Sequence, residues 1–309
     1  RTHFRHPRPK GQIAEHPRQE VDDLSRNSFT IKKNTRMDFV LRPGHEVGEE
    51  VRRIVLGEID GALEQLAQYE EEPDLAIHLL RKHNKKIRGV LRMQKTGIEK
   101  RMFTQVNSLV RDSAKLFAEV RDALVSVQTL EFLAGEFTED VPHGVSGIRE
   151  SLEEVHVRLR DRTEMLSCVE QSEAAFTQVR KAAETWNWSR VTMETSLDGL
   201  VSNYAKAREC YNTALASRDP EDCHDWRKYA KYMSFHCSLF GELLPDPMLS
   251  LATQSEELAS WLGEHHDLAV FRDLMDERSE DVAVWLSNLA EERQSELEDL
   301  SHQLTRSTT

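Results

Sequence analysis

The sequence has few residues of the kinds that break helices. Its 309 residues include only 13 glycines and 9 prolines, whereas a turn-dense β fold uses both more often. No segment alternates apolar and polar residues with period two over a useful length. Charged residues make up 31% of the chain and hydrophobic residues 39%. This composition predicts an all-α protein with long, surface-rich helices.

Cysteines and long apolar runs are also scarce. The four cysteines form no C-x-x-C pair, which favours reduced thiols in a cytosolic protein. No run approaches the roughly 18 apolar residues of a membrane span, and no short apolar core follows a basic start as in a secretory signal. We therefore expect a soluble cytoplasmic protein without a membrane partner.

The usual sequence signatures of catalysis are missing as well. We find no Gly-rich phosphate loop, no G-x-S-x-G and no carboxylate cluster of the two-metal type. His265, His266 and Asp267 could ligate a metal, but adjacent side chains on a helix point about 100° apart. We expect no catalytic residues, no cofactor and no metal, and therefore no enzyme activity.

Basic residues are outnumbered by acidic ones. The formal net charge of -13 argues against a general nucleic-acid binder. Residues 1–36 carry nine Arg and Lys and four Asp and Glu, which leaves 32 basic and 50 acidic residues in the rest of the chain. Any anion site must therefore be a focused basic patch on an acidic body.

Hydrophobic periodicity divides the chain into an arm and two helical parts. Residues 1–36 lack an apolar period and are interpreted as a flexible arm or linker, followed by parts at 37–184 and 185–309. Asp219 is expected to cap a helix that starts at Pro220, and Pro245 and Pro247 to stop it. A linker is expected at 135–147, and helices near 45–70, 74–95, 98–134 (one long or broken helix), 148–184, 192–217, 220–244, 248–277 and 280–305.

The most informative pattern is a duplicated basic string. His78-x-x-Arg81-Lys82-x-x-Lys85 recurs as His224-x-x-Arg227-Lys228-x-x-Lys231, each time after a Pro-marked helix start. Farther along the chain, Glu119 to Val125 aligns with Glu264 to Val270 at an offset of 145 residues rather than 146. Two matched segments at nearly one offset indicate internal duplication.

The first copy of this string forms one cationic helix face. Arg81, Lys82, Lys85, Arg88 and Arg92 fall within about 80° of His78, opposite the apolar residues. Basic residues at i,i+4 repel one another, and this segment contains no acid, so an ordinary solvated face is a poor explanation. A bound polyanion explains the pattern more simply, because Arg, Lys and protonated His can all donate to phosphate.

The sequence resembles the CHAD family, the conserved-histidine α-helical domain. The resemblance spans about residues 37–300 and rests on both basic strings, on Leu262 to Leu268 with its weaker counterpart Phe117 to Leu124, and on Gly199-x-x-x-x-Tyr204-x-Lys206-x-Arg208. It implies two four-helix bundles related by a pseudo-twofold axis, with a basic groove or pore that binds inorganic polyphosphate. It also implies association with polyphosphate granules and with CYTH-type phosphohydrolases.

The resemblance also implies which residues contact the polymer. Two positions depart from the pattern: Arg121 stands where a histidine is expected, and Phe235 stands where the first copy has Gly89. The implied contacts are His78, Arg81, Lys82, Lys85, Arg88, Arg92, Tyr204, Lys206, Arg208, His224, Arg227, Lys228, Lys231 and His266.

Three alternatives remain open from the sequence. The chain could be an adaptor or regulatory domain that packs against a phosphohydrolase or a granule protein, with phosphate binding secondary. It could act on polyphosphate or a nucleoside triphosphate, which the missing acidic cluster argues against. It could instead bind transfer RNA, which competition with long-chain polyphosphate would test.

Overall fold

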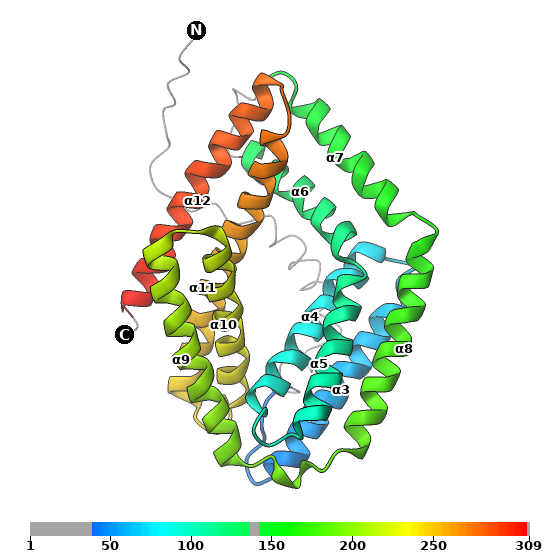
Figure 1. Ribbon diagram of the computed structural model, residues 1–309, viewed down its shortest axis with the longest axis vertical. Coiled ribbons are helices and arrows are strands. Elements are labelled where there is room, and N and C mark those ends of the chain that lie inside the picture. The colour runs from blue at the N-terminus through cyan, green and yellow to red at the C-terminus, as the bar shows by residue number, and fades with distance from the viewer. Residues whose placement is uncertain (1–38, 136–141, 308–309) are drawn as a thin grey trace.

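The described part of the chain has an all-α fold, as predicted. The computed structural model describes residues 39–135 and 142–307 (Figure 1). Within these ranges it has ten α-helices, one short 3-10 helix and no strand. The helices are α3 (Val47–Ala67), α4 (Pro73–Met93), α5 (Lys100–Lys115), α6 (Ala118–Gly135), α7 (Val145–Arg160), α8 (Glu164–Thr185), η2 (Trp188–Arg190), α9 (Met193–Ser217), α10 (Pro220–Leu239), α11 (Pro245–Asp276) and α12 (Asp281–Ser307).

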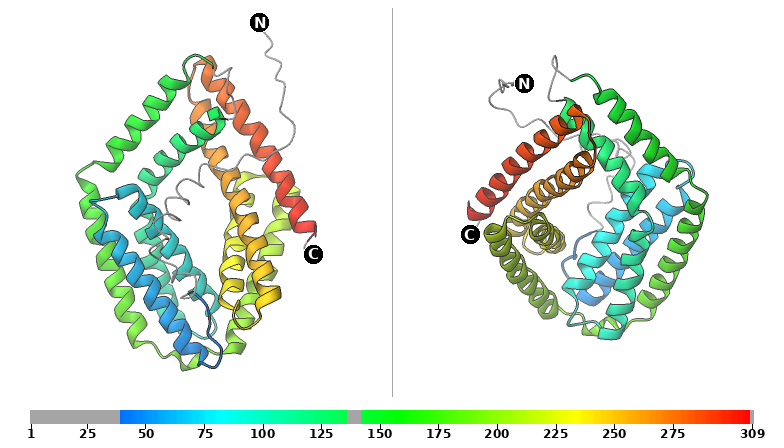
Figure 2. Two further views of the ribbon diagram at one scale, coloured as in Figure 1. Left: turned by 180° about the vertical axis from the view of Figure 1, so that it is seen from behind. Right: turned by 45° about the horizontal axis from the view of Figure 1, so that its top comes forward.

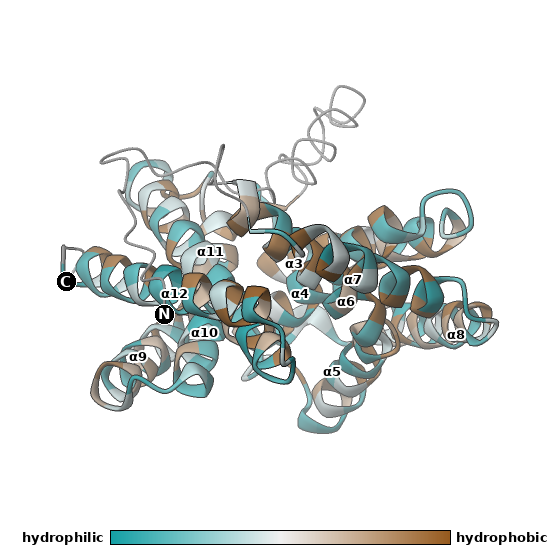
Figure 3. Cartoon of the chain, turned by 90° about the horizontal axis from the view of Figure 1, so that it is seen from above, coloured by the Kyte–Doolittle hydropathy of each residue, from teal (hydrophilic) through white to brown (hydrophobic). Residues whose placement is uncertain are grey.

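Four helices from the first part of the chain surround one hydrophobic core. Helix α3 packs against α4 and α8, and α5 packs against the same two helices. Ile59, Leu80, Val110 and Phe176, one from each helix, are all buried there. Each helix is amphipathic, and Figure 3 shows hydrophilic and hydrophobic residues on the same helices. Burial of these apolar faces holds the group together.

The second group consists of α9, α10, α11 and α12, each packed on the next (Figure 2). Helices α6 and α7 join this group, because Leu130 and Ile148 lie in one buried cluster with Phe271 of α11 and Leu286 of α12. That cluster crosses the predicted boundary between residues 184 and 185. The division at this boundary into two bundles, and their pseudo-twofold relation, therefore stay predictions.

Several helix ends agree with the sequence and others correct it. Asp219 caps α10 by accepting a hydrogen bond from the Glu221 amide, and Pro220 is its first residue, as predicted. Pro245 was expected to stop a helix and instead begins α11, because proline is tolerated in the first turn. Helix α10 ends at Leu239 rather than near 244. The segment 98–134 is broken between α5 and α6, and the segment 148–184 between α7 and α8.

The two basic strings lie on helices that cross each other. Helix α4 contacts α10 where Gly89 faces Phe235, and the ring of His236 donates through Nε2 to the Gly89 carbonyl at 2.9 Å. A Cβ atom on Gly89 would lie 2.9 Å from the Phe235 ring, so the glycine leaves room for the phenylalanine. These two residues, which departed from the expected pattern, are therefore complementary at the crossing.

The predicted arm, the predicted linker and the expected absence of a membrane span can also be compared with the structure. The predicted arm at 1–36 lies outside the described residues, as do residues 136–141 of the expected linker, and α7 already begins at Val145. Along the described part of the chain, none of the helices combines the length and apolar character needed to cross a bilayer.

Candidate functional site

Helix α4 presents the predicted cationic face. Leu80, Ile87 and Leu91 are fully buried, while Lys82 and Lys85 on the other side are exposed. The helix starts at Pro73, and Asp74 in its first turn complements the helix dipole. Apolar and basic residues thus separate onto opposite sides, as the sequence predicts.

Lys85 lies at the centre of a group of cations from three helices. Burial and then the charges of Arg227, Arg81, Arg121 and Lys231 hold its pKa well below the usual value for lysine. Lys85 is nevertheless exposed to solvent. We call Arg81, Lys85, Arg121, Arg227 and Lys231 the cation cluster.

Two arginines of the cluster are close to one another and to acids. Burial, followed by repulsion from Arg121, lowers the Arg81 pKa to about 10. Arg121 donates to Asp122 at 2.9 Å and, across to α11, to Asp267 at 3.2 Å. Burial lowers the pKa of Arg121, but these two carboxylates outweigh it and the pKa is raised. Asp267 is only 5% exposed, so this ion pair also fastens α6 to α11.

Arg121 was not among the predicted contacts. The sequence shows it only as the counterpart of His266 in the weaker second match. Its charge nevertheless acts on both Arg81 and Lys85. The offset between the two matched segments was therefore the signal that could have identified it.

Two predicted histidines lie beside the cluster. The rings of His224 on α10 and His266 on α11 have their centroids 4.5 Å apart. Burial lowers the pKa of each, and Arg227 lowers it further in both cases. The Nδ1 atom of His224 is buried without a hydrogen-bond partner. Both imidazoles are therefore neutral at neutral pH and can become donors when an anion approaches.

Other predicted basic contacts on α4 and α10 have different surroundings, and Lys231 of the cluster also has an acidic partner. Lys228 pairs with Asp225 at 2.6 Å, and Lys231 pairs with Glu256 of α11. Arg92 stacks over the Tyr232 ring with 4.9 Å between its guanidinium carbon and the ring centroid, and Arg88 donates to Asn107 at 3.2 Å. Asp225 and Asp267 each accept a hydrogen bond from a cation, Lys228 and Arg121 respectively. The cationic face of α4 therefore contacts residues of both α5 and α10.

The three predicted residues of α9 do not share one face. Tyr204 and Arg208 are exposed and hydrogen-bond to each other at 3.4 Å. Lys206, about 200° from Tyr204 around the helix, bonds Glu209 at 2.7 Å. The charge of Lys206 acts on Asp225 of α10, whereas no described contact joins Tyr204 or Arg208 to the cation cluster. A role for these three residues in binding stays a prediction.

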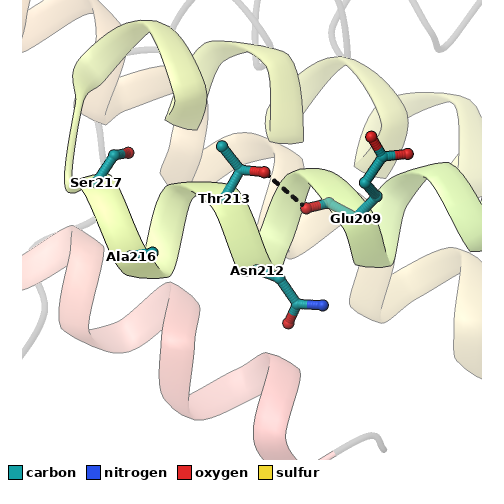
Figure 4. Close-up of a pocket in the computed structure, with 5 residues that line it drawn as sticks. All are labelled: Glu209, Asn212, Thr213, Ala216 and Ser217. Atoms are coloured by element: carbon teal, nitrogen blue, oxygen red, sulfur yellow. Dashed lines mark hydrogen bonds between the residues drawn. The ribbon is translucent and has the colours of Figure 1, made fainter.

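A separate hollow lies along the C-terminal half of α9. It is lined by Glu209, Asn212, Thr213, Ala216 and Ser217, none of which is basic (Figure 4). Among the described residues no group of three or more His, Cys, Asp or Glu side chains could hold a metal ion. The cation cluster, by contrast, brings together five basic residues from three helices, a composition that suits an anionic ligand.

The comparison with protein families agrees with this arrangement. The chain matches the CHAD domain over residues 58–276, which is more than half of its length. It belongs to the CHAD family. The match includes both basic strings, and this family is generally non-catalytic and is associated with polyphosphate. No curated protein matches the chain.

Proposed function

We propose that this CHAD domain binds inorganic polyphosphate without a catalytic step. The observation that carries the proposal is the convergence of charge on Lys85, an exposed lysine on which Arg81, Arg121, Arg227 and Lys231 from three helices all act. Like charges that lie close together repel one another, and partial burial weakens the screening by water. A chain of phosphates would relieve that repulsion at several positions at once.

The geometry favours an extended anion over a compact one. Cations from α4, α6 and α10 act on one lysine, and the His224–His266 pair lies next to them. A single phosphate can reach only some of these groups, whereas a polymer can contact them in succession. On this proposal, the protein associates with polyphosphate granules because it binds the polymer itself. It would likewise share this ligand with a CYTH-type phosphohydrolase.

Single substitutions in the two crossing helices test the proposal. We expect Lys85→Ala and Arg227→Ala each to weaken binding of long-chain polyphosphate about tenfold, since a charge-assisted hydrogen bond contributes about 1.5–3 kcal/mol. Lys100→Ala and Arg101→Ala are matched controls, because these cations are exposed at the start of α5. Affinity is measured by titration at one fixed salt concentration, with a thermal melt of each variant.

The controls give the experiment two ways to fail. If the unmodified chain does not bind long-chain polyphosphate, the proposed function is wrong. If Lys85→Ala and Arg227→Ala lose no more affinity than the α5 controls, the polymer binds elsewhere and the cation cluster is not the site.

A further inference from the structure

Glu256 on α11 is an acid placed among the predicted phosphate contacts. Its carboxylate accepts hydrogen bonds from Lys231 Nζ and, at 2.8 Å, from Ser234 Oγ. Lys82 of α4 also acts on it electrostatically. Two of these three partners belong to the duplicated basic strings, but Ser234 and Glu256 do not.

Glu256 shares the surroundings of Lys85. Half of its side chain is exposed, yet burial is the largest influence on its pKa and acts to raise it. Lys231, Ser234 and Lys82 outweigh burial, so the pKa is lowered and the carboxylate stays ionised. Lys231, which pairs with Glu256, is also one of the cations that act on Lys85. The acid therefore belongs to the same region as the cation cluster.

The donors around Glu256 form an anion site that is already occupied. An ammonium group and a hydroxyl aimed at one carboxylate could hold a phosphate oxygen equally well. Asp267 differs from Glu256, because it is almost fully buried and ties α6 to α11. Glu256 has the exposure that a group needs in order to move aside.

We propose that Lys231, Ser234 and Lys82 form a phosphate subsite that the chain's own Glu256 occupies when no polymer is bound. The inference rests on the proposed function and adds Ser234 and Glu256 to it. A polyphosphate chain anchored at Lys85 and Arg227 presents further phosphates to Lys231 at a high effective concentration. One of them displaces the carboxylate, which swings toward solvent. Glu256 thereby lowers the affinity for the polymer and keeps its binding reversible.

The test compares two neighbouring glutamates. Glu256→Gln removes the competing charge, keeps the shape of the side chain and should strengthen binding of long-chain polyphosphate about three- to fivefold, the value of an exposed ion pair. Glu257→Gln removes the same charge from the next residue, which is exposed on the same helix, and should change affinity much less. The salt dependence should steepen by about 0.7–0.9 in log-log slope for Glu256→Gln alone, since one more cation is available to phosphate.

A second background separates the subsite from a general effect of charge. In Lys231→Met protein, Glu256→Gln should no longer strengthen binding, because the cation that both anions share is gone. Equal effects of Glu256→Gln and Glu257→Gln, or a gain that persists without Lys231, would overturn the inference. If long-chain polyphosphate binds the unmodified chain and Lys85→Ala weakens that binding while Glu256→Gln has no effect, only the subsite is wrong. If the unmodified chain does not bind the polymer, the proposed function itself fails.

Discussion

At the scale of single residues, the sequence identified cations more reliably than their partners. The repeated strings predicted Arg81, Lys85, Arg227 and Lys231, and all four act in one cluster. The same strings gave no sign that Glu256 would pair with Lys231, because the two residues lie on different helices. Helical periodicity indicates which residues share a face of one helix, whereas the side chains they meet on a neighbouring helix depend on how the helices pack.

The charge of Lys85 should destabilise the folded protein. Burial and four neighbouring cations lower its pKa, so its charge is unfavourable in the free protein. We predict that Lys85→Met raises the free energy of unfolding by about 1 kcal/mol, a value limited by solvent screening of this exposed side chain. Denaturant unfolding at neutral pH measures it, with Lys100→Met as the matched control. A loss of stability in Lys85→Met would show that the cations are not mutually repulsive.

At the scale of helices, local sequence rules predicted which helices exist better than they predicted where each helix ends. Periodicity and the Pro-marked starts gave α3, α4 and α9 to within about three residues and gave the start of α10, whose end was predicted five residues too late. The same residue type misled at Pro245, since proline both follows one helix and begins the next. The break between α5 and α6 falls beside Phe117, which is fully buried. Neither glycine nor proline marks this break in the sequence. Tertiary packing decides such breaks.

Two glycines in helices should respond in opposite ways to the same substitution. A Cβ on Gly199 of α9 would lie 1.9 Å from the Met93 carbonyl oxygen of α4, and backbone cannot easily move aside. We predict that Gly199→Ala lowers the free energy of unfolding by about 1–3 kcal/mol through overpacking. Gly57 of α3 has nothing near it, so Gly57→Ala should raise stability by about 0.5–1 kcal/mol. Chemical denaturation compares the two, and equal effects would contradict the close approach of α9 to α4.

At the scale of the molecule, net charge and local charge point in opposite directions. The chain carries a formal charge of -13, and yet cations from three helices converge on Lys85. The sequence suggested this contrast, since its duplicated strings are basic in an acidic chain. It did not predict that α6 and α7 would pack on α11 and α12, because an apolar stripe does not specify its partner. That packing places Arg121 in the cluster beside Asp267.

The same convergence predicts how binding depends on pH. In the free protein, burial and neighbouring cations lower the pKa values of Lys85, His224 and His266. A bound polyanion favours the charged forms and raises these values, so binding takes up protons. Affinity should be highest below the free-state pKa of the two histidines and fall as pH rises through their bound-state pKa. Titrations between about pH 5.5 and 8.5 measure this decline, and the histidine part of it should flatten in His224→Gln/His266→Gln protein. An affinity that stays constant across that range would mean that both imidazoles remain neutral beside the polymer, and that lysine and arginine alone hold it.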